Sequence, residues 1–133
     1  MEKILLVGDD FSLLATRVAI LTKMGASAVG CDPLELAIHL GNEKFDLVIL
    51  CHTLKPNVRK SVIEDARRRW PQVRILQLFS RLDEMPAEAL PVDAVASTDP
   101  ADLIAHIAKL LGRPPRKPPA RARQPRSQWS KVA

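Results

Sequence analysis

The distribution of apolar residues along the chain predicts five β-strands. Residues 4–7 form a continuous apolar run, and similar runs follow at residues 46–50 and 73–78. Runs of this kind are typical of strands covered on both faces, as in a parallel sheet. Two shorter apolar stretches, residues 29–31 and 92–96, are interpreted as further strands of the same sheet.

Segments with apolar residues at helical spacing lie between these runs. The spacing predicts five helices, within residues 13–21, 36–40, 58–66, 83–90 and 99–112. Pro86 interrupts the fourth of them. Strands and helices therefore alternate along the chain.

Two of the predicted helices begin with the same capping pattern. Residues 32–35 and 99–102 each place an aspartate before a proline, with an acidic residue two positions after the proline. An N-cap acceptor, a proline at the first helical position and an acid in the first turn all favour the start of a helix. We expect Gly41 and Gly112 to end these two helices in the left-handed conformation.

The alternation of elements predicts a fold class. Parallel strands joined by right-handed crossovers of this length form a doubly wound sheet with helices on both faces. We expect a flavodoxin-like α/β fold with five strands in the order 2-1-3-4-5 and five helices. A single domain would cover residues 1–112.

The composition changes sharply after Gly112. Residues 113–128 contain five prolines and no Leu, Ile, Val or Phe, so they cannot bury enough apolar surface to offset the entropy of ordering them. We therefore predict a disordered tail at residues 113–133. The tail carries seven basic residues and no acidic ones: Arg113, Arg116, Lys117, Arg121, Arg123, Arg126 and Lys131. The other thirteen Lys and Arg are outnumbered by fifteen Asp and Glu in residues 1–112, so the positive charge belongs to the tail.

The rest of the composition narrows the class of protein. The apolar segment at the amino terminus is far too short for a signal peptide, and no stretch approaches the ~20 apolar residues that span a bilayer. We expect a cytoplasmic protein without membrane contact. Cys31 and Cys51 are too few and too far apart for a disulfide framework or a zinc site, so we expect reduced thiols.

Four local strings, taken in their order and spacing, resemble the receiver (CheY-like) domain of bacterial response regulators. Residues 4–14 resemble the first strand and acidic turn of the family, and residues 45–50 resemble the strand that leads to its phosphorylated aspartate. Residues 67–73 resemble the end of its third helix, and residues 92–95 its last strand. The resemblance covers about residues 3–112 and implies a module of phosphorelay (two-component) signal transduction.

Several residues that carry the chemistry of this family are absent. Receivers use an aspartate nucleophile, an acidic pair that helps to hold Mg²⁺, a Ser or Thr, and a lysine. Cys51 stands at the position of the acceptor aspartate, and a thiol neither forms an acyl phosphate nor suits Mg²⁺. Gly8 stands at the first acid of the pair, which leaves Asp9 and Asp10.

The remaining switch positions depart from the family as well. Phe79 falls at the Ser/Thr position, with Ser80 one residue away, and no lysine is found around Thr98. The resemblance therefore implies a degenerate receiver, or pseudo-receiver, that does not take up a phosphoryl group.

Asp9 and Asp10 allow two interpretations. The pair could share a divalent cation such as Mg²⁺, or one of the two, or Ser12, could cap the first helix. We favour capping and expect no metal and no cofactor.

Cys51 also allows two interpretations. It could be a redox switch in place of the phosphorylation switch, or a buried inert thiol, which we favour. His52 adjoins it, but neighbours in a strand point to opposite faces, so we expect no nucleophile and base pair. We expect no disulfide with Cys31, because the flavodoxin-like order separates the two strands by about 10 Å.

Two further patterns suggest other sites. Gly8 follows a strand, as in a nucleotide-binding loop, but the other glycines of such a loop are absent and the adjoining aspartates would repel phosphate. Arg67, Arg68 and Arg69 could form a docking patch, although basic residues at a helix end usually complement the helix dipole and face water. We favour the solvated interpretation.

These observations favour a signalling module without enzymatic activity that acts through protein–protein contacts. By resemblance, residues 83–111 would meet a regulatory protein partner. The alternatives are a nucleic-acid-associated protein that acts through its basic tail, with Trp129 adding base stacking, or a nucleotide-binding domain on the same fold.

Overall fold

Five parallel strands form one sheet in the order β2-β1-β3-β4-β5, which confirms the predicted strand order. The computed structural model describes residues 2–80 and 91–112. The strands are β1 (Lys3–Val7), β2 (Ser27–Cys31), β3 (Leu47–Leu50), β4 (Arg74–Phe79) and β5 (Ala94–Ser97). The predicted runs locate all five, with ends that differ by one or two residues.

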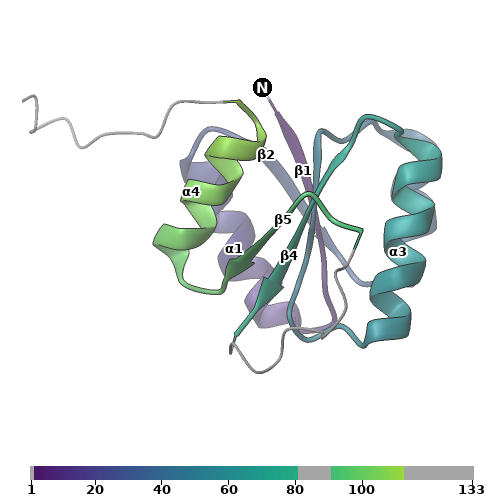
Figure 1. Cartoon of the computed structure of the whole chain (residues 1–133), viewed down its shortest axis with the longest axis horizontal. Coiled ribbons are helices and arrows are strands. Elements are labelled where there is room, and N and C mark those ends of the chain that lie inside the picture. Colours follow the sequence, from purple (N-terminus) through teal and green to yellow (C-terminus); the bar gives the residue numbers. More distant parts are fainter. Residues whose placement is uncertain (1, 81–90, 113–133) are drawn as a thin grey trace, which may run out of the picture.

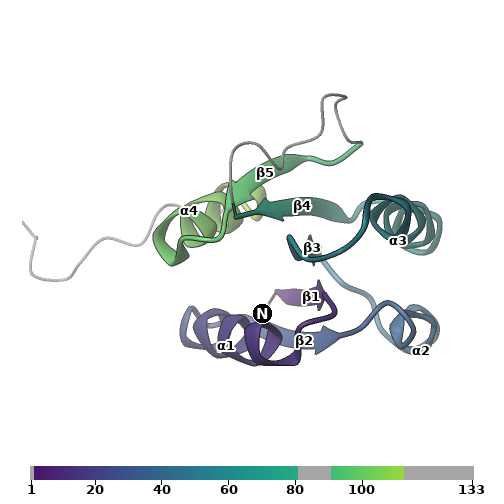
Figure 2. The ribbon, with the colours of Figure 1, turned by 90° about the horizontal axis from the view of Figure 1, so that it is seen from below.

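Among the described residues, two helices cover each face of the sheet (Figures 1 and 2). They are α1 (Phe11–Lys23), α2 (Leu36–Asn42), α3 (Pro56–Arg69) and α4 (Pro100–Leu110). The helices α1 and α4 lie on one face, and α2 and α3 lie on the other (Figure 2). The helix predicted at residues 83–90 and the tail predicted at 113–133 lie outside the described residues.

The central strands are buried on both faces, which explains why their sequences do not alternate. Leu5 of β1 belongs to the apolar cluster under α2 and α3, whereas its neighbour Ile4 belongs to the cluster under α1 and α4. Both side chains are fully buried. A strand between two helical layers needs apolar residues at every position, so the continuous run is a consequence of the doubly wound architecture.

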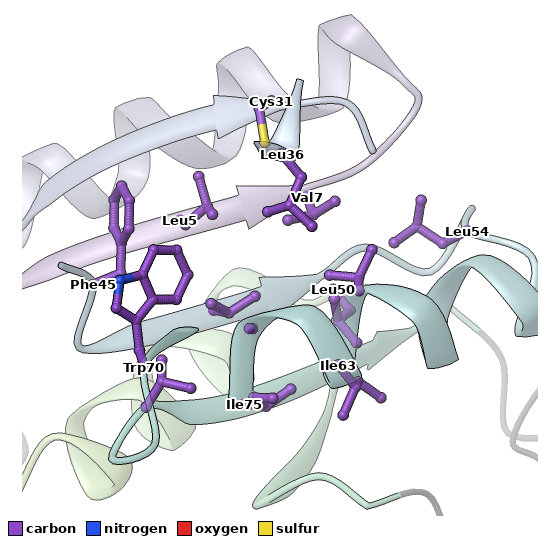
Figure 3. Packing of buried hydrophobic residues seen from close by; sticks show 14 residues of the cluster. Leu5, Val7, Cys31, Leu36, Phe45, Leu50, Leu54, Ile63, Trp70 and Ile75 are labelled. Carbon is purple, nitrogen blue, oxygen red and sulfur yellow. The ribbon is translucent and has the colours of Figure 1, made fainter. Parts of the chain in front are cut away.

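Aromatic residues close one end of the core beneath α2 and α3 (Figure 3). The rings of Phe45 and Trp70 pack edge to face with centroids 5.3 Å apart. The indole Nε1 of Trp70 donates a hydrogen bond of 2.8 Å to the carbonyl of Glu43, so the polar atom of this buried side chain has a partner. This contact ties the end of α3 to the segment that leads into β3.

The two predicted capping sites have different outcomes. Asp99 caps α4 as predicted, because its carboxylate accepts from the amide of Asp102, and Gly112 follows that helix with a φ of +74°. The prediction for α2 is wrong at both ends. The helix begins at Leu36, and Gly41 lies inside it rather than in the left-handed conformation.

The structure shows why α2 begins late. Asp32 and Glu35 exchange hydrogen bonds, with the amide of Asp32 donating to the Glu35 carboxylate and the amide of Glu35 to the Asp32 carboxylate. This reciprocal pairing has the geometry of a capping box, but it closes a turn ahead of the helix. Residues 32–35 therefore form a separate turn between β2 and α2.

Candidate functional site at the carboxyl edge of the sheet

Cys51 lies directly beyond β3, at the edge of the sheet where the parallel strands end. Its amide donates a hydrogen bond of 2.9 Å to the carbonyl of Val7, which places it beside Gly8 at the end of β1. The side chain is 2 % exposed and packs in the cluster under α1 and α4. The sequence therefore placed this residue correctly, at the end of the third strand.

Gly8 is in close contact with the thiol of Cys51. A Cβ atom built on Gly8 would lie 2.9 Å from the Sγ and 3.0 Å from the Cβ of Cys51. Real Cβ atoms essentially never approach other atoms this closely, so a side chain at position 8 would require Cys51 to move. The residues at positions 8 and 51, both of which depart from the receiver pattern, therefore constrain each other through this contact.

Asp10 caps α1, as the favoured interpretation predicts. Its carboxylate accepts a hydrogen bond of 3.1 Å from the amide of Leu13, and the backbone of Asp10 is extended as an N-cap requires. Asp9 is exposed to solvent beside it. One carboxylate of the pair is therefore engaged by the helix.

The residues at this edge do not fit a magnesium ion. Mg²⁺ prefers hard oxygen ligands in octahedral geometry, and the nearest candidates are the exposed Asp9, the engaged Asp10 and the soft sulfur of Cys51. Within residues 2–80 and 91–112, no three His, Cys, Asp or Glu side chains form a group that could hold a metal.

Arg17 reaches into the site from α1 and was missed by the sequence analysis. It is 5 % exposed, and its Nη2 donates to the Nδ1 of His52 across 3.4 Å. Its Nη1 is buried without a hydrogen-bond partner among the described residues. The helical spacing contained this information, because Arg17 lies on the same stripe of α1 as the buried Leu14 and Leu21.

The thiol of Cys51 is held in its protonated form. Burial raises the pKa of Cys51 above its ordinary value of 9.0, and this effect outweighs the neighbouring Arg17 guanidinium, which lowers the pKa by its charge and by a hydrogen bond. A thiolate is needed for nucleophilic or redox chemistry. These surroundings support the inert interpretation.

The reason given for excluding an acid–base pair of Cys51 and His52 is wrong. The alternation of faces ends with β3 at Leu50, and His52 lies in the following turn. Both Cys51 and His52 interact with Arg17, on the α1 side of the sheet. A second arginine, Arg59 of α3, donates a hydrogen bond of 3.1 Å to the carbonyl of His52.

Cys31 and Cys51 are both free and buried. They belong to the two separate clusters on opposite faces of the sheet, so the expectation that they do not pair is confirmed. Burial, followed by the charges of Glu35 and Asp32, raises the pKa of Cys31 to about 12.

Phe79 and Thr98, which were expected at the switch positions, adjoin each other where β4 and β5 end. Phe79 ends β4 and is half-buried, and its carbonyl accepts a hydrogen bond of 3.1 Å from the amide of Thr98. Phe79 therefore occupies the strand end, and Ser80 lies one residue beyond it. Neither side chain adds a positive charge to the site.

At the start of α4, the carboxylate of Asp102 accepts two hydrogen bonds from the end of β5. The Oδ2 of Asp102 accepts hydrogen bonds from the amide of Ser97 at 2.8 Å and from its hydroxyl at 2.9 Å. These two bonds are the main reason that the pKa of Asp102 lies below its ordinary value. The network fixes the backbone around Thr98 without a lysine.

The three arginines at the end of α3, which we expected to face water, are partly engaged by other segments. Arg67 donates to the carbonyl of Pro91 and to Asp93, and Arg69 donates to the carbonyl of Leu40. Arg68 pairs with Asp65 one turn earlier. All three lie in the last turn of α3, as expected, but two of them tie α3 to neighbouring segments.

The strand order and the two helical layers are those of the response regulator receiver fold. The chain is similar to the signal receiver domain of an HD domain-containing protein from Pseudomonas fluorescens Pf-5, with a TM-score of 0.70, 18% identity, and coverage of 84% of this chain and 94% of that one. It is also similar to the chemotaxis protein CheY4 of Vibrio cholerae, with a TM-score of 0.69, 18% identity, and coverage of 83% and 98%. A third similar structure is the response regulator TrrA of Thermotoga maritima in complex with Mg²⁺ and BeF. Its TM-score is 0.69 and its identity 19%, with coverage of 83% of this chain and 99% of that one.

These similarities confirm the receiver (CheY-like) fold that the sequence resemblance implied. A scan against family models and a search of curated proteins found no match. In the part of the chain that the structure describes, no helix is long and apolar enough to cross a membrane.

Proposed function

We propose that this chain is a receiver-like signalling module that acts by binding a regulatory protein and is not switched by phosphorylation at position 51. Its fold neighbours are response regulator receiver domains from two-component systems. The module would keep the scaffold of such a domain and use it as a binding surface.

The buried thiol at the end of β3 carries this proposal. An acyl phosphate needs a carboxylate nucleophile, and Cys51 supplies a protonated sulfur packed against Gly8. Arg17 places a guanidinium beside it, in a site whose nearest carboxylates are the exposed Asp9 and the helix-capping Asp10. In this proposal, Cys51 replaces the nucleophile of a receiver, and Arg17 supplies a positive charge beside it in place of a bound metal ion.

Intact mass measurement tests the absence of phosphorylation directly. Incubation with acetyl phosphate and Mg²⁺ should leave the mass of this protein unchanged, while an ordinary receiver treated in parallel gains a phosphoryl group. An adduct on the wild type that disappears in the variant Cys51→Ala would contradict the proposal.

A protein partner is proposed by analogy with a fold neighbour. One structure similar to this chain is the response regulator TrrA in complex with the histidine kinase ThkA. In this chain, the candidate surface lies on the described part of residues 83–111, which contains β5 and α4. The outward face of α4 presents one residue per turn: Ala101, Ala105 and Lys109. The two small alanine side chains would let a partner approach the helix backbone closely.

Matched substitutions test this surface. Ala105 on α4 and Ala37 on α2 are both exposed helical alanines, so arginine in place of either changes charge and bulk equally. A partner captured by the wild type should be lost with Ala105→Arg and retained with Ala37→Arg. Equal retention by both variants would move the partner surface away from α4.

The binding of nucleic acid by the tail stays a prediction. Seven basic residues without acids would bind polyanions with strong salt dependence. Retention on immobilised duplex DNA should then be lost in 0.5 M salt and also on deletion of residues 113–133. Retention that survives the deletion would exclude the tail as its cause.

A further inference from the structure

A cleft opens beside the degenerate site, where α1 begins and the edge strand β2 ends. Its volume is about 270 Å³. Apolar side chains of α1 form one wall, and acidic residues of the two adjoining loops form the rim. The wall includes Phe11, Leu14 and Val18, and the rim includes Asp9, Asp32 and Glu35.

One of the largest exposed apolar side chains of the described residues lies in this cleft. Phe11, at the start of α1, is 85% exposed and lines the cleft together with the acidic rim residues. An exposed apolar side chain in a cleft with a polar rim is typical of an interaction site.

The charge of the rim limits what can occupy the cleft. Asp9, Asp32 and Glu35 are accompanied by Asp10, and no Lys or Arg lines the cleft. The Asp10 carboxylate also caps α1, but its negative charge remains. The matching occupant is therefore a basic segment that carries a large apolar side chain.

The chain contains one segment of that chemistry. Residues 113–133 carry seven basic residues, no acidic ones, and Trp129 followed by Val132. We propose that this tail docks in the cleft of its own domain, with its basic residues on the acidic rim and Trp129 against Phe11. This inference does not depend on the proposed function.

The tail is long enough to make this contact. It leaves α4 at the opposite edge of the sheet, because Leu110 and Leu111 share a surface pocket with Glu2 and Asp46 at the starts of β1 and β3. The thirteen residues of α1, which lies on the same face as α4 (Figure 1), cover that distance in about 20 Å. The seventeen residues from Arg113 to Trp129 span up to ~50 Å at ~3.1 Å per residue.

Docking within one molecule is favoured over docking between two copies. A covalently attached segment meets its site at an effective concentration in the millimolar range, provided that the linker spans the gap. A cleft of this size and exposure would bind a separate peptide weakly. Attachment converts that weak contact into a populated state at ordinary protein concentrations.

A spin label on the tail of the full chain tests the contact. The variant Ser127→Cys can be labelled with a nitroxide under native conditions, because Cys31 and Cys51 are buried. At low salt we expect selective paramagnetic broadening of the amides of Phe11, Gly30 and Glu35. The broadening should disappear in 0.5 M NaCl, because the Debye length falls below ~5 Å.

Two variants and one matched control assign the effect. Glu35→Gln keeps the hydrogen bond to the Asp32 amide but removes a rim charge, and should weaken the broadening about twofold, as expected for one exposed ion pair. Phe11→Ser should abolish it. Glu64→Gln removes an exposed charge from α3, on the other face, and should have no effect.

Three outcomes would overturn the proposal. The first is broadening spread evenly over the domain, and the second is an equal effect of Glu35→Gln and Glu64→Gln. For the third, spin-labelled chains without ¹⁵N are mixed at the same concentration with ¹⁵N chains that carry no spin label. Broadening of the ¹⁵N chains would place the contact between two copies. A fourth outcome also overturns the proposal: no broadening at the cleft at low salt, whether or not the tail then binds added DNA.

Discussion

The Sγ of Cys51 lies 2.9 Å from the point where a side chain on Gly8 would begin. Both residues directly follow parallel strands that are neighbours in the sheet, and the amide of Cys51 donates a hydrogen bond to the carbonyl of Val7, the residue before Gly8. A side chain at position 8, where the receiver resemblance places an acid, therefore cannot be accommodated by one substitution. The buried sulfur has to be moved as well.

This packing predicts a coupled effect of two substitutions. Gly8→Ala should lower the free energy of unfolding by about 1–3 kcal/mol, the usual range for overpacking a core. In the background Cys51→Ala the same change should be milder by at least ~0.5 kcal/mol, because the sulfur contact is gone while the 3.0 Å contact with Cβ remains. Urea unfolding of the four proteins measures this coupling, and equal costs in both backgrounds would show that the contact is unimportant.

Thiol labelling checks the protonation and burial of both cysteines. A pKa near 12 for Cys31, instead of 9.0, leaves about a thousandfold less thiolate at neutral pH, and the pKa of Cys51 is raised as well. Reaction with a thiolate-specific reagent should therefore be slow in buffer and rapid in denaturant. Fast labelling of Cys51 in the folded protein would instead support the redox interpretation.

The fold could be predicted from the sequence because its strongest determinant is local. Strands buried on both faces need uninterrupted apolar runs, and the runs in β1 and β3 are hard to place in any other class of fold. Helix ends were less predictable. Gly25, with a φ of +93°, ends α1, where the amide of Ala26 bonds to the carbonyl of Leu21 as in a Schellman motif, whereas Gly41 has no such role.

The site could be predicted only where it depends on position along a strand. Cys51 follows an apolar run, so its place at the carboxyl edge follows from the topology. The contact between Arg17 and His52 joins residues 35 positions apart, and a charged residue in a helix is ordinarily assigned to solvent. Only its place on the apolar stripe of α1 indicated that Arg17 is buried.

Arg17 offers a prediction about the energetics of the site. A buried guanidinium with an unpartnered Nη1 among the described residues retains part of its dehydration penalty. Arg17→Met should therefore leave the free energy of unfolding unchanged or raise it by about 1 kcal/mol. Arg59→Met, which removes the other arginine on His52, is the comparison. A loss above about 1 kcal/mol in Arg17→Met would show that its contacts outweigh this penalty.

The start of α4 should make the stability of the protein depend on pH. The pKa of Asp102 is lower in the folded protein than its ordinary value of 3.8, so its contribution is complete above that value and is lost as the pH falls through the folded pKa. The difference in melting temperature between the wild type and Asp102→Asn should be present at pH 5 and shrink below about pH 4. Asp65→Asn, which removes only the exposed pair with Arg68, serves as the control. A difference that persists unchanged at pH 3 would argue against this assignment.

The most direct test of the account is amide NMR of the full chain with beryllofluoride and Mg²⁺, after a reference titration with Mg²⁺ alone. An aspartate acceptor binds this phosphoryl analogue together with the metal, whereas a buried thiol beside a guanidinium does not. We predict that the resonances of Asp9, Cys51 and Thr98 stay in place when beryllofluoride is added. Coordinated shifts at all three residues, beyond those caused by Mg²⁺ alone, would contradict the claim that this site has lost its phosphorylation chemistry.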